Sequence, residues 1–249
     1  MSSYAAFADF YDDLMTDVDY GRYADRVLEL LDRQGHDPGL TLDLACGTGS
    51  LTLALAERGV DVFGLDGSPD MLSVAQQKAA EQGKDLLFIC QRMPDIELYS
   101  TVDTVVCALD SINHITDAED VGKTFAAVSE YLSPGGMFLF DVNTVYKHRE
   151  VLGDRTYVCE GDGVFCVWQN DYDEAEHTVA VTLDFFEEDN GAYYRQTEEF
   201  EERAYPEEDL IKMLESAGLS VVAVYDGLTE DLPKGETERL LIVAQKPTA

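Results

Sequence analysis

The side chains best suited to proton transfer lie in the polar segment Asp110-Ser111-Ile112-Asn113-His114, which directly follows an apolar run. An imidazole changes its charge near neutral pH, so His114 could accept a proton from an amine or a hydroxyl that attacks a second molecule. Asp110 is the other candidate for this role. A purely structural role for both side chains is the alternative.

A glycine-containing loop follows the apolar run that begins at Thr41. Asp43-Leu44-Ala45-Cys46-Gly47-Thr48-Gly49 leads into residues 50–56, whose apolar spacing predicts a helix. Gly47 and Gly49 can adopt positive φ and let a ligand lie against the backbone, and the first N–H groups of the helix can bind polar atoms. This succession of strand, turn and helix predicts a binding site for part of a nucleoside-bearing ligand.

An acidic residue stands at the end of the next apolar run. Residues 60–65 predict a second strand, and Asp66 follows it about twenty residues after the glycines, the separation at which a carboxylate meets a ribose in βαβ units. Nicotinamide-dependent dehydrogenases and methyltransferases that use S-adenosylmethionine (SAM) share this arrangement. The dinucleotide motif G-x-G-x-x-G needs a third glycine where Thr52 stands, so the loop favours a methyltransferase. An NAD(P)-dependent oxidoreductase is the alternative.

Three motifs resemble those of class I SAM-dependent methyltransferases. Residues 43–49 and 64–72 are similar to the first two motifs of that family, and residues 132–141 are similar to its turn and fifth strand. A narrower resemblance, to a small bacterial branch of unassigned substrate, rests on residues 11–15, 17–20 and 110–114. The likeness covers most of residues 40 to 141 and, more loosely, the C-terminal part.

The resemblance implies that SAM is the cofactor and gives particular residues roles. Asp43 would orient the amino end of the methionine part, Asp66 would hold the ribose, and the backbone at Ala45 and Gly47 would line the cofactor. The implied cofactor-binding residues are Tyr11, Tyr20, Asp43, Ala45, Cys46, Gly47, Asp66, Gly67, Met71, Arg92, Met93 and Ala108. For the two tyrosines and Met71, plain core packing is the alternative.

Arg92 departs from the related branch, in which an acidic residue would accept a bond from the adenine amino group. A guanidinium cannot accept hydrogen bonds, so either the backbone near Met93 contacts the adenine, or Arg92 stacks on the ring or points to solvent. The same departure keeps a third interpretation open, a SAM-binding protein without transfer activity.

The chain is strongly acidic, with 17 Lys and Arg against 50 Asp and Glu, a formal net charge of −33. Such a field repels phosphate backbones, and no basic run offsets it, so nucleic acid and anionic membrane surfaces are excluded as partners. Solubility explains the acidity, and attraction of a cationic substrate is the alternative.

Five cysteines without a C-x-x-C pattern argue against a disulfide framework and against a metal site, and they favour a reducing cytoplasm. The N-terminal residues have no basic start, and no apolar run approaches the length of a membrane span. We therefore expect a cytoplasmic protein without a targeting segment.

The order of predicted elements favours an α/β fold with a doubly wound, mostly parallel seven-stranded sheet and an antiparallel last strand. Strands are predicted at residues 41–44, 60–65, 86–90, 102–109, 136–142, 219–225 and 240–244, and helices that would cover the cofactor pocket at 4–14 and 20–31. Residues 143–205 predict an inserted antiparallel β subdomain, so residues 1–142 and 206–249 would form the Rossmann-like domain. We expect the insertion to form a lid over the acceptor, and a structural wall or a homodimer surface is the alternative.

These features predict methyl transfer from SAM to a small-molecule acceptor by in-line displacement. The sulfonium is already a good leaving group, so alignment of the reactants should matter more than any general base. The acceptor site would lie between Tyr11, residues 110–114 and the β insertion. The sequence does not distinguish an amine, hydroxyl or carboxylate acceptor.

Overall fold

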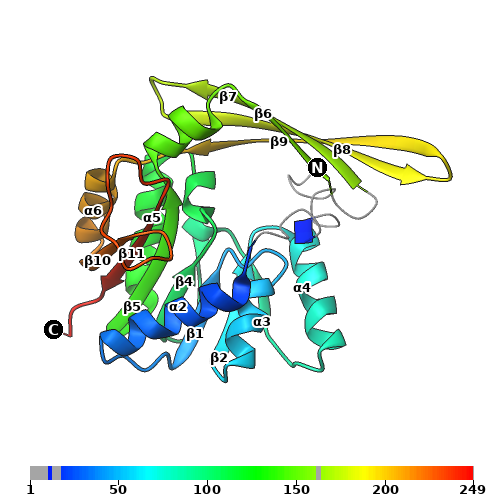
Figure 1. Ribbon diagram of the computed structural model, residues 1–249. Coiled ribbons are helices and arrows are strands. Elements are labelled where there is room, and N and C mark those ends of the chain that lie inside the picture. Colours follow the sequence, from blue (N-terminus) through cyan, green and yellow to red (C-terminus); the bar gives the residue numbers. More distant parts are fainter. Residues whose placement is uncertain (1–10, 13–17, 161–163, 249) are drawn as a thin grey trace.

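The computed structural model describes residues 11–12, 18–160 and 164–248 and contains two β-sheets (Figure 1). The seven strands of the larger sheet are β1 (Leu40–Leu44), β2 (Asp61–Asp66), β3 (Phe88–Cys90), β4 (Val102–Cys107), β5 (Leu132–Asn143), β10 (Ser220–Asp226) and β11 (Arg239–Gln245). The helices are α2 (Tyr20–Arg33), α3 (Ser50–Glu57), α4 (Pro69–Glu81), α5 (Ala118–Tyr131) and α6 (Glu207–Ser216), with the short turns η1 (Met93–Asp95), η2 (Ser111–His114) and η3 (Lys147–Leu152).

The strand order of the larger sheet is β10-β11-β5-β4-β1-β2-β3. The pairs β1–β2, β1–β4, β2–β3 and β4–β5 are parallel, whereas β11 runs antiparallel to both β5 and β10. This confirms the predicted doubly wound sheet with an antiparallel last strand. The chain order reverses between β1 and β4, and open α/β sheets bind ligands at the carboxyl ends of the strands that flank such a reversal.

Helices cover both faces of this sheet because the side chains of each strand alternate between its faces. Phe138 and Phe140 of β5 pack with α5 and α6, whereas Met137 and Leu139 pack with α2 and α3. None of the helices in the described parts of the chain combines the length and the apolar composition needed to cross a bilayer. The helix predicted over residues 4–14 lies outside the described residues, apart from its positions 11 and 12.

The third strand is shorter than the sequence predicts. A strand is predicted over residues 86–90, but β3 begins at Phe88 and forms the edge of the sheet, and Leu87 is 60% exposed. An apolar run does not reveal whether its strand has one neighbour or two. The fifth strand begins earlier than predicted, at Leu132, which pairs with Val102.

The smaller sheet consists of β6 (Thr156–Glu160), β7 (Val164–Asp173), β8 (Thr178–Asp189) and β9 (Ala192–Arg203), antiparallel and in that order. The predicted turn at Asn190-Gly191 joins β8 and β9, and both residues have positive φ, 52° and 80°, as a two-residue hairpin turn of type I′ requires. This sheet, called the lid sheet below, extends above the carboxyl ends of the parallel strands (Figure 1). The side-chain amide of Asn113 donates to the carbonyl of Arg203, the last residue of β9, at 2.8 Å and so holds this end of the lid sheet in place.

Candidate active site

The loop between β1 and α3 has the backbone shape that its glycines predict. Gly47 and Gly49 have φ of 53° and 75°, and Ala45 shares this left-handed conformation with φ of 58°. A Cβ on Gly49 would lie 2.9 Å from Ala75 Cβ, so this glycine permits close packing of α4. A Cβ on Gly47 would meet no heavy atom of the described residues within 4 Å, so this position leaves room for a ligand against the backbone.

Asp66, at the end of β2, bonds to this loop and to the N-cap residue of α4. Its Oδ2 accepts from the N–H of Gly47 at 2.8 Å, and its Oδ1 accepts from the N–H of Ser68 at 2.8 Å. Burial raises the pKa of Asp66, although these N–H groups and His114 oppose the shift. Each carboxylate oxygen has a further lone pair, so a ribose hydroxyl can still donate to it.

Asp43 lies at the other end of the loop and is fully buried. Its Oδ2 accepts from the hydroxyl of Thr52 at 2.6 Å. Burial raises the pKa of Asp43 to about 7, and the neighbouring Asp66 contributes in the same direction. The carboxylate is therefore poised to ionise when a cationic group approaches it.

A cavity of about 670 Å³ extends from the glycine loop to η2, and its size is typical of sites for small molecules. The predicted site residues that line it are Tyr11, Ala45, Gly47, Asp66, Gly67, Met71, Arg92, Met93 and His114. An adjoining cavity of about 40 Å³ is lined by Tyr11, Tyr20, Asp43, Ala45, Cys46, Gly47 and Ala108, among others. Thus every residue that the sequence predicts to bind the cofactor lines one of two neighbouring cavities.

Tyr11 and Tyr20 both line the smaller cavity, and Tyr11 also lines the larger one. Burial raises the pKa of Tyr11 well above its usual value and raises that of Tyr20 to about 12. Both phenols therefore stay neutral at physiological pH and present a hydroxyl rather than a phenolate to a ligand.

Arg92 lies at the outer rim of the larger cavity, where its side chain is 71% exposed. Its guanidinium approaches Asp95 at 3.8 Å. This arrangement favours the alternative in which Arg92 points to solvent. Met93, the first residue of η1, and the buried Met71 of α4 line the same cavity.

Asp12 bonds to the end of the glycine loop, a contact that the sequence did not predict. Its Oδ1 accepts from the hydroxyls of Thr48 at 2.8 Å and of Ser50 at 3.2 Å. Its Oδ2 accepts from Nζ of Lys78 at 2.6 Å. Asp12 stands within the motif at residues 11–15, but nothing in that motif indicates which side chains it meets.

Asp141, at the end of β5, organises the loop that follows β4. Its carboxylate is buried and accepts from the N–H groups of Leu109 at 3.0 Å and Asp110 at 2.6 Å. Tyr23 Oη and Arg239 Nη1 donate to it as well, both at 2.5 Å. Leu109 and Asp110 have φ of 57° and 54°, a costly conformation for residues other than glycine, and these bonds hold the loop in it.

Asp110 is engaged on both carboxylate oxygens. Arg239 Nη2 donates to Oδ1 at 2.8 Å, and the Asn143 amide donates to Oδ2 at 2.7 Å. Burial alone would favour the neutral acid, but Arg239, Lys147 and His114 together lower the pKa of Asp110 to about 2. Asp110 is not among the described residues that line either cavity, so the geometry favours its structural alternative.

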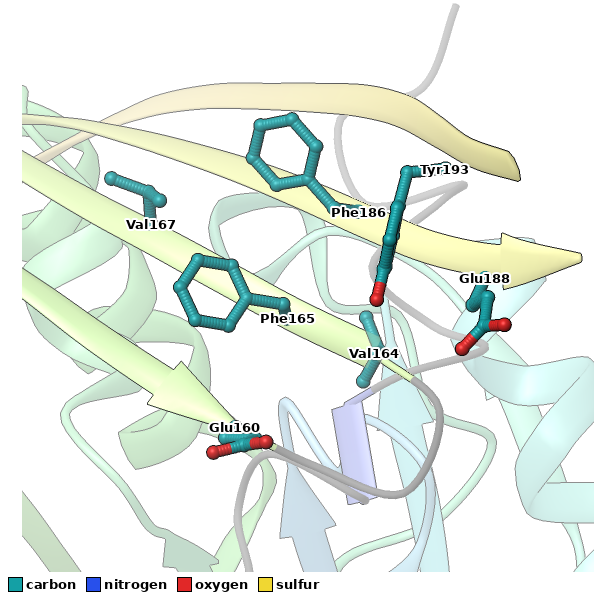
Figure 2. A pocket seen from close by; sticks show the side chains of 7 residues that line it. All are labelled: Glu160, Val164, Phe165, Val167, Phe186, Glu188 and Tyr193. Atoms are coloured by element: carbon teal, nitrogen blue, oxygen red, sulfur yellow. The ribbon is translucent and has the colours of Figure 1, made fainter. Parts of the chain in front are cut away.

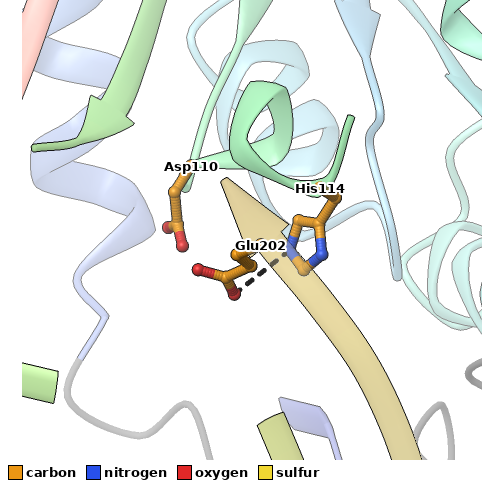
Figure 3. A group of neighbouring side chains, drawn as sticks. All are labelled: Asp110, His114 and Glu202. Carbon is orange, nitrogen blue, oxygen red and sulfur yellow. Dashed lines mark ion pairs between the residues drawn. The ribbon is translucent and has the colours of Figure 1, made fainter. Parts of the chain in front are cut away.

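His114, the last residue of η2, lines the larger cavity and meets two side chains of the lid strand β9. Its Nε2 lies 3.7 Å from Oε1 of Glu202 (Figure 3), and its ring centroid lies 5.3 Å from that of Phe200. The sequence analysis missed Glu202, because one glutamate within the acidic run of β9 carries no distinguishing signal.

Asp110, His114 and Glu202 each offer a donor atom within 4.8 Å of the others, a spacing that could suggest a metal ion. However, Asp110 already accepts from Arg239, and the ammonium of Lys147 lies among these carboxylates. Two neighbouring cations reduce the attraction for a third, so the donor set fits an ion-pair network better than a metal site.

The lid sheet has a hollow of its own, also of about 670 Å³ (Figure 2). Its lining residues are Glu160, Val164, Phe165, Val167, Phe186, Glu188 and Tyr193. None of the predicted site residues is among these described lining residues, and neither a histidine nor the glycine loop contributes. The chemistry therefore belongs to the cavity above the larger sheet.

Comparisons with known proteins agree with this geometry. A sequence model described as "Methyltransferase domain" matches residues 41–136. The chain is 36% identical over 244 residues to "Putative methyltransferase YqeM" of Bacillus subtilis (strain 168), which covers 98% of this chain and 97% of the relative. A SAM-dependent methyltransferase of Clostridium acetobutylicum ATCC 824 has a crystal structure with a TM-score of 0.89 and 36% identity, covering 98% of this chain and 99% of that chain.

A more distant structure shares the fold. It is an amino pentose methyltransferase from Micromonospora echinaspora with SAM bound, with a TM-score of 0.74, 21% identity and 92% coverage of both chains. In this protein the open space over Gly47 and the carboxylates of Asp43 and Asp66 suit the nucleoside and the ammonium of that cofactor. The chain therefore belongs to the class I SAM-dependent methyltransferases, and SAM is its cofactor.

Proposed function

We propose that this enzyme methylates the amino group of a small molecule bound between η2 and the lid sheet. The observation that carries the proposal is the continuation of the larger cavity beyond the glycine loop to Ser111 and His114. Three carboxylates line this cavity, from Asp66, Asp117 and Asp120. A lining with this excess of carboxylates attracts a cationic acceptor and repels an anionic one.

The cofactor contacts in this proposal follow the two cavities. Asp66 holds the ribose hydroxyls, Asp43 pairs with the amino end of the methionine part, and Tyr11 and Tyr20 cover that end. The backbone from Ala45 to Gly47, with Ala108 opposite, lines the middle, and Gly67, Met71, Arg92 and Met93 surround the adenine end.

When bound, SAM supplies a methyl group on a sulfonium, which is a good leaving group. The residues of the chain align the acceptor nitrogen and exclude water, and such alignment can contribute about 7–11 kcal/mol to lowering the barrier. A protonated amine is not nucleophilic, so His114 accepts its proton at a ring nitrogen before the attack. Asp110 stays ionised and balances the charge of Arg239 behind this site.

Two relatives support an amine acceptor by their names. Glycine/sarcosine N-methyltransferase of Halorhodospira halochloris is 28% identical over 165 residues, covering 64% of this chain and 60% of the relative. The amino pentose methyltransferase described above shares the fold. Both names describe transfer to small molecules, which agrees with an acidic chain that repels nucleic acid.

The β insertion at residues 143–205 acts as the lid of this site in the same proposal, and the remainder of the chain forms the SAM-binding domain. Free thiols at all five cysteines are compatible with work in the cytoplasm, where thiols stay reduced.

Ligand binding and turnover test the proposal separately. Isothermal titration calorimetry should show binding of SAM and S-adenosylhomocysteine and none of NAD(P). Labelled SAM should then transfer its methyl group to members of a panel of primary and secondary amines, and not to matched alcohols or carboxylic acids. Transfer to the alcohols or acids alone would contradict the amine assignment, and binding without any transfer would indicate the inactive cofactor-binding protein.

A further inference from the structure

One buried carboxylate of the lid sheet stands between two imidazoles. Glu202 is 6% exposed, and its Oε1 lies 3.7 Å from Nε2 of His114 (Figure 3), while its Oε2 lies 3.5 Å from Nε2 of His148. The other charged groups that face it are Asp110, within 4.8 Å, and Lys147, whose ammonium interacts with it electrostatically. Both of its ion pairs within the described residues are with histidines.

His148, in η3, faces this carboxylate with its buried ring. The side chain is fully buried, and neither ring nitrogen has a hydrogen-bond partner among the described residues. Its Nε2 faces Glu202, so a small movement converts the 3.5 Å separation into a hydrogen bond that fixes the carboxylate. A buried polar ring with no partner is costly, and this movement removes part of that cost.

We propose that Glu202 is a positioning residue for His114 and that His148 holds Glu202 in place. This inference rests on the proposed function, in which His114 accepts the proton of the acceptor amine. With Nε2–H directed at Glu202, Nδ1 on the opposite side of the ring carries the lone pair. The proton of the acceptor ammonium passes to Nδ1, and Glu202 pairs with the imidazolium that forms.

The separation of 3.7 Å is longer than a hydrogen bond, as is common for catalytic contacts before the substrate binds. Contacts with the lid sheet can shorten the separation between His114 and Glu202. Phe200, two residues before Glu202 on the same face of β9, packs against the ring of His114. When β9 packs on η2, the ring of Phe200 and the carboxylate of Glu202 therefore contact His114 together. In this proposal His114 is oriented for proton transfer only when the lid sheet covers it.

Three variants of the whole enzyme test the inference. Glu202→Gln removes the charge and keeps the shape, Glu202→Asp keeps the charge, and Asp184→Asn is the matched control. Asp184 is a carboxylate of the neighbouring strand β8, also 6% exposed, and it pairs with Arg195 instead of a histidine. The melting temperature of each variant reports whether the lid sheet remains folded.

In Glu202→Gln we expect kcat to fall by about 10- to 100-fold with the KM for SAM unchanged. The acid limb of the pH–rate profile should move to lower pH, because a nearby carboxylate favours the imidazolium. Asp66 and Asp110 also face His114 and remain in all variants, so the limb moves without disappearing. Glu202→Asp should recover part of kcat, and Asp184→Asn should keep the wild-type profile.

An NMR titration of the His114 ring, assigned with His114→Gln, follows the same pair without turnover. Protonation of the ring should require a lower pH in Glu202→Gln than in the wild type. An unmoved titration, or a kcat and profile like those of Asp184→Asn, would overturn the inference even if amine methylation is found. Loss of activity with a chelator and recovery with Mn²⁺ or Zn²⁺ would also overturn it, because the cluster would then bind a metal. If no amine is methylated but the titration moves, the proposed function fails and the pairing stands.

Discussion

The hydroxyl of Thr52 donates a hydrogen bond of 2.6 Å to Oδ2 of Asp43 inside the wall of the cofactor site. Thr52 stands where a dinucleotide-binding loop would have its third glycine. The residue that argues against NAD(P) therefore also orients the carboxylate that we assign to the amino end of SAM. Burial raises the pKa of Asp43 to about 7. Near physiological pH, the side chain of Asp43 therefore releases a proton when it pairs with the ammonium of SAM.

SAM should bind about tenfold more weakly at pH 6 than at pH 8. Below its pKa of about 7, Asp43 is protonated and must release its proton before it can pair with the SAM ammonium. Calorimetry at pH 6 in two buffers of different ionisation enthalpy should detect this release. In Asp43→Asn the affinity should be low and flat over this range, and a flat profile in the wild type would exclude Asp43 as the ammonium partner.

The same substitution should stabilise the protein at high pH. The raised pKa means that Asp43 ionises in the unfolded chain from about pH 4 but in the folded chain only near pH 7, so folded stability falls as the pH rises through this window. Asn carries no charge and avoids this loss. Asp43→Asn should therefore gain about 2 kcal/mol relative to the wild type at pH 8 and less at pH 5, measured by urea unfolding.

Asp66→Asn should raise the Kd for SAM by about 30- to 100-fold, since hydrogen bonds to a charged acceptor contribute about 1.5–3 kcal/mol each. Asn keeps an acceptor for only one of the N–H groups of Gly47 and Ser68, so the melting temperature of the variant is measured beside its Kd to report whether the protein stays folded. Asp61→Asn, at the exposed start of the same strand, is the control. An unchanged Kd in Asp66→Asn would show that another residue holds the ribose.

The sequence predicts those parts of the site whose residues all belong to one short, continuous segment of the chain. The glycine loop, its helix and Asp66 belong to a single βαβ unit, whose local geometry follows from strand pattern and glycine positions. Strand patterns also predicted the antiparallel ending and the lid sheet. The edge position of β3 was not predicted, because the apolar composition of a strand does not indicate whether it pairs with one strand or with two.

The remaining contacts join segments that are distant in sequence, and composition gives no register between them. Arg239 pairs with Asp110 across 129 positions, and Asp12 meets Lys78 across 66. Glu202 is one of many glutamates in β9, and only the docking of the lid on η2 distinguishes it. Charge pairs of this kind depend on the tertiary fold and cannot be read from the order of residues alone.

Arg239→Met should destabilise the fold by about 3–5 kcal/mol at pH 7, because it leaves the carboxylates of Asp110 and Asp141 without their cation. The wild-type pKa of Asp110 is about 2, below its unfolded value, so the stability from this pairing is present above about pH 4 and is lost as the pH falls toward 2. The difference between variant and wild type should therefore shrink at pH 3.

Arg33→Met provides the comparison for this prediction. Arg33 pairs with Glu29 and Glu230 at the surface, where the loss of an ion pair has little effect on stability because water screens the charges. Urea unfolding at pH 7 and pH 3 measures both variants. Equal effects of the two substitutions, or a difference that does not change with pH, would mean that the buried network does not organise the loop after β4.

The contacts of Asp12 with the glycine loop and α4 can be measured with a double-mutant cycle on Asp12 and Lys78. Asp12→Asn and Lys78→Met each break the ion pair of 2.6 Å, and each removes one of the two charged side chains that bond to the hydroxyls of Thr48 and Ser50. Each variant should weaken SAM binding by about tenfold, because Tyr11, adjacent to Asp12, covers both cavities. The double variant should be little worse than either single one, with a coupling energy of about 1 kcal/mol. Additive losses would show that the two side chains act on the cofactor site independently, which would contradict this prediction.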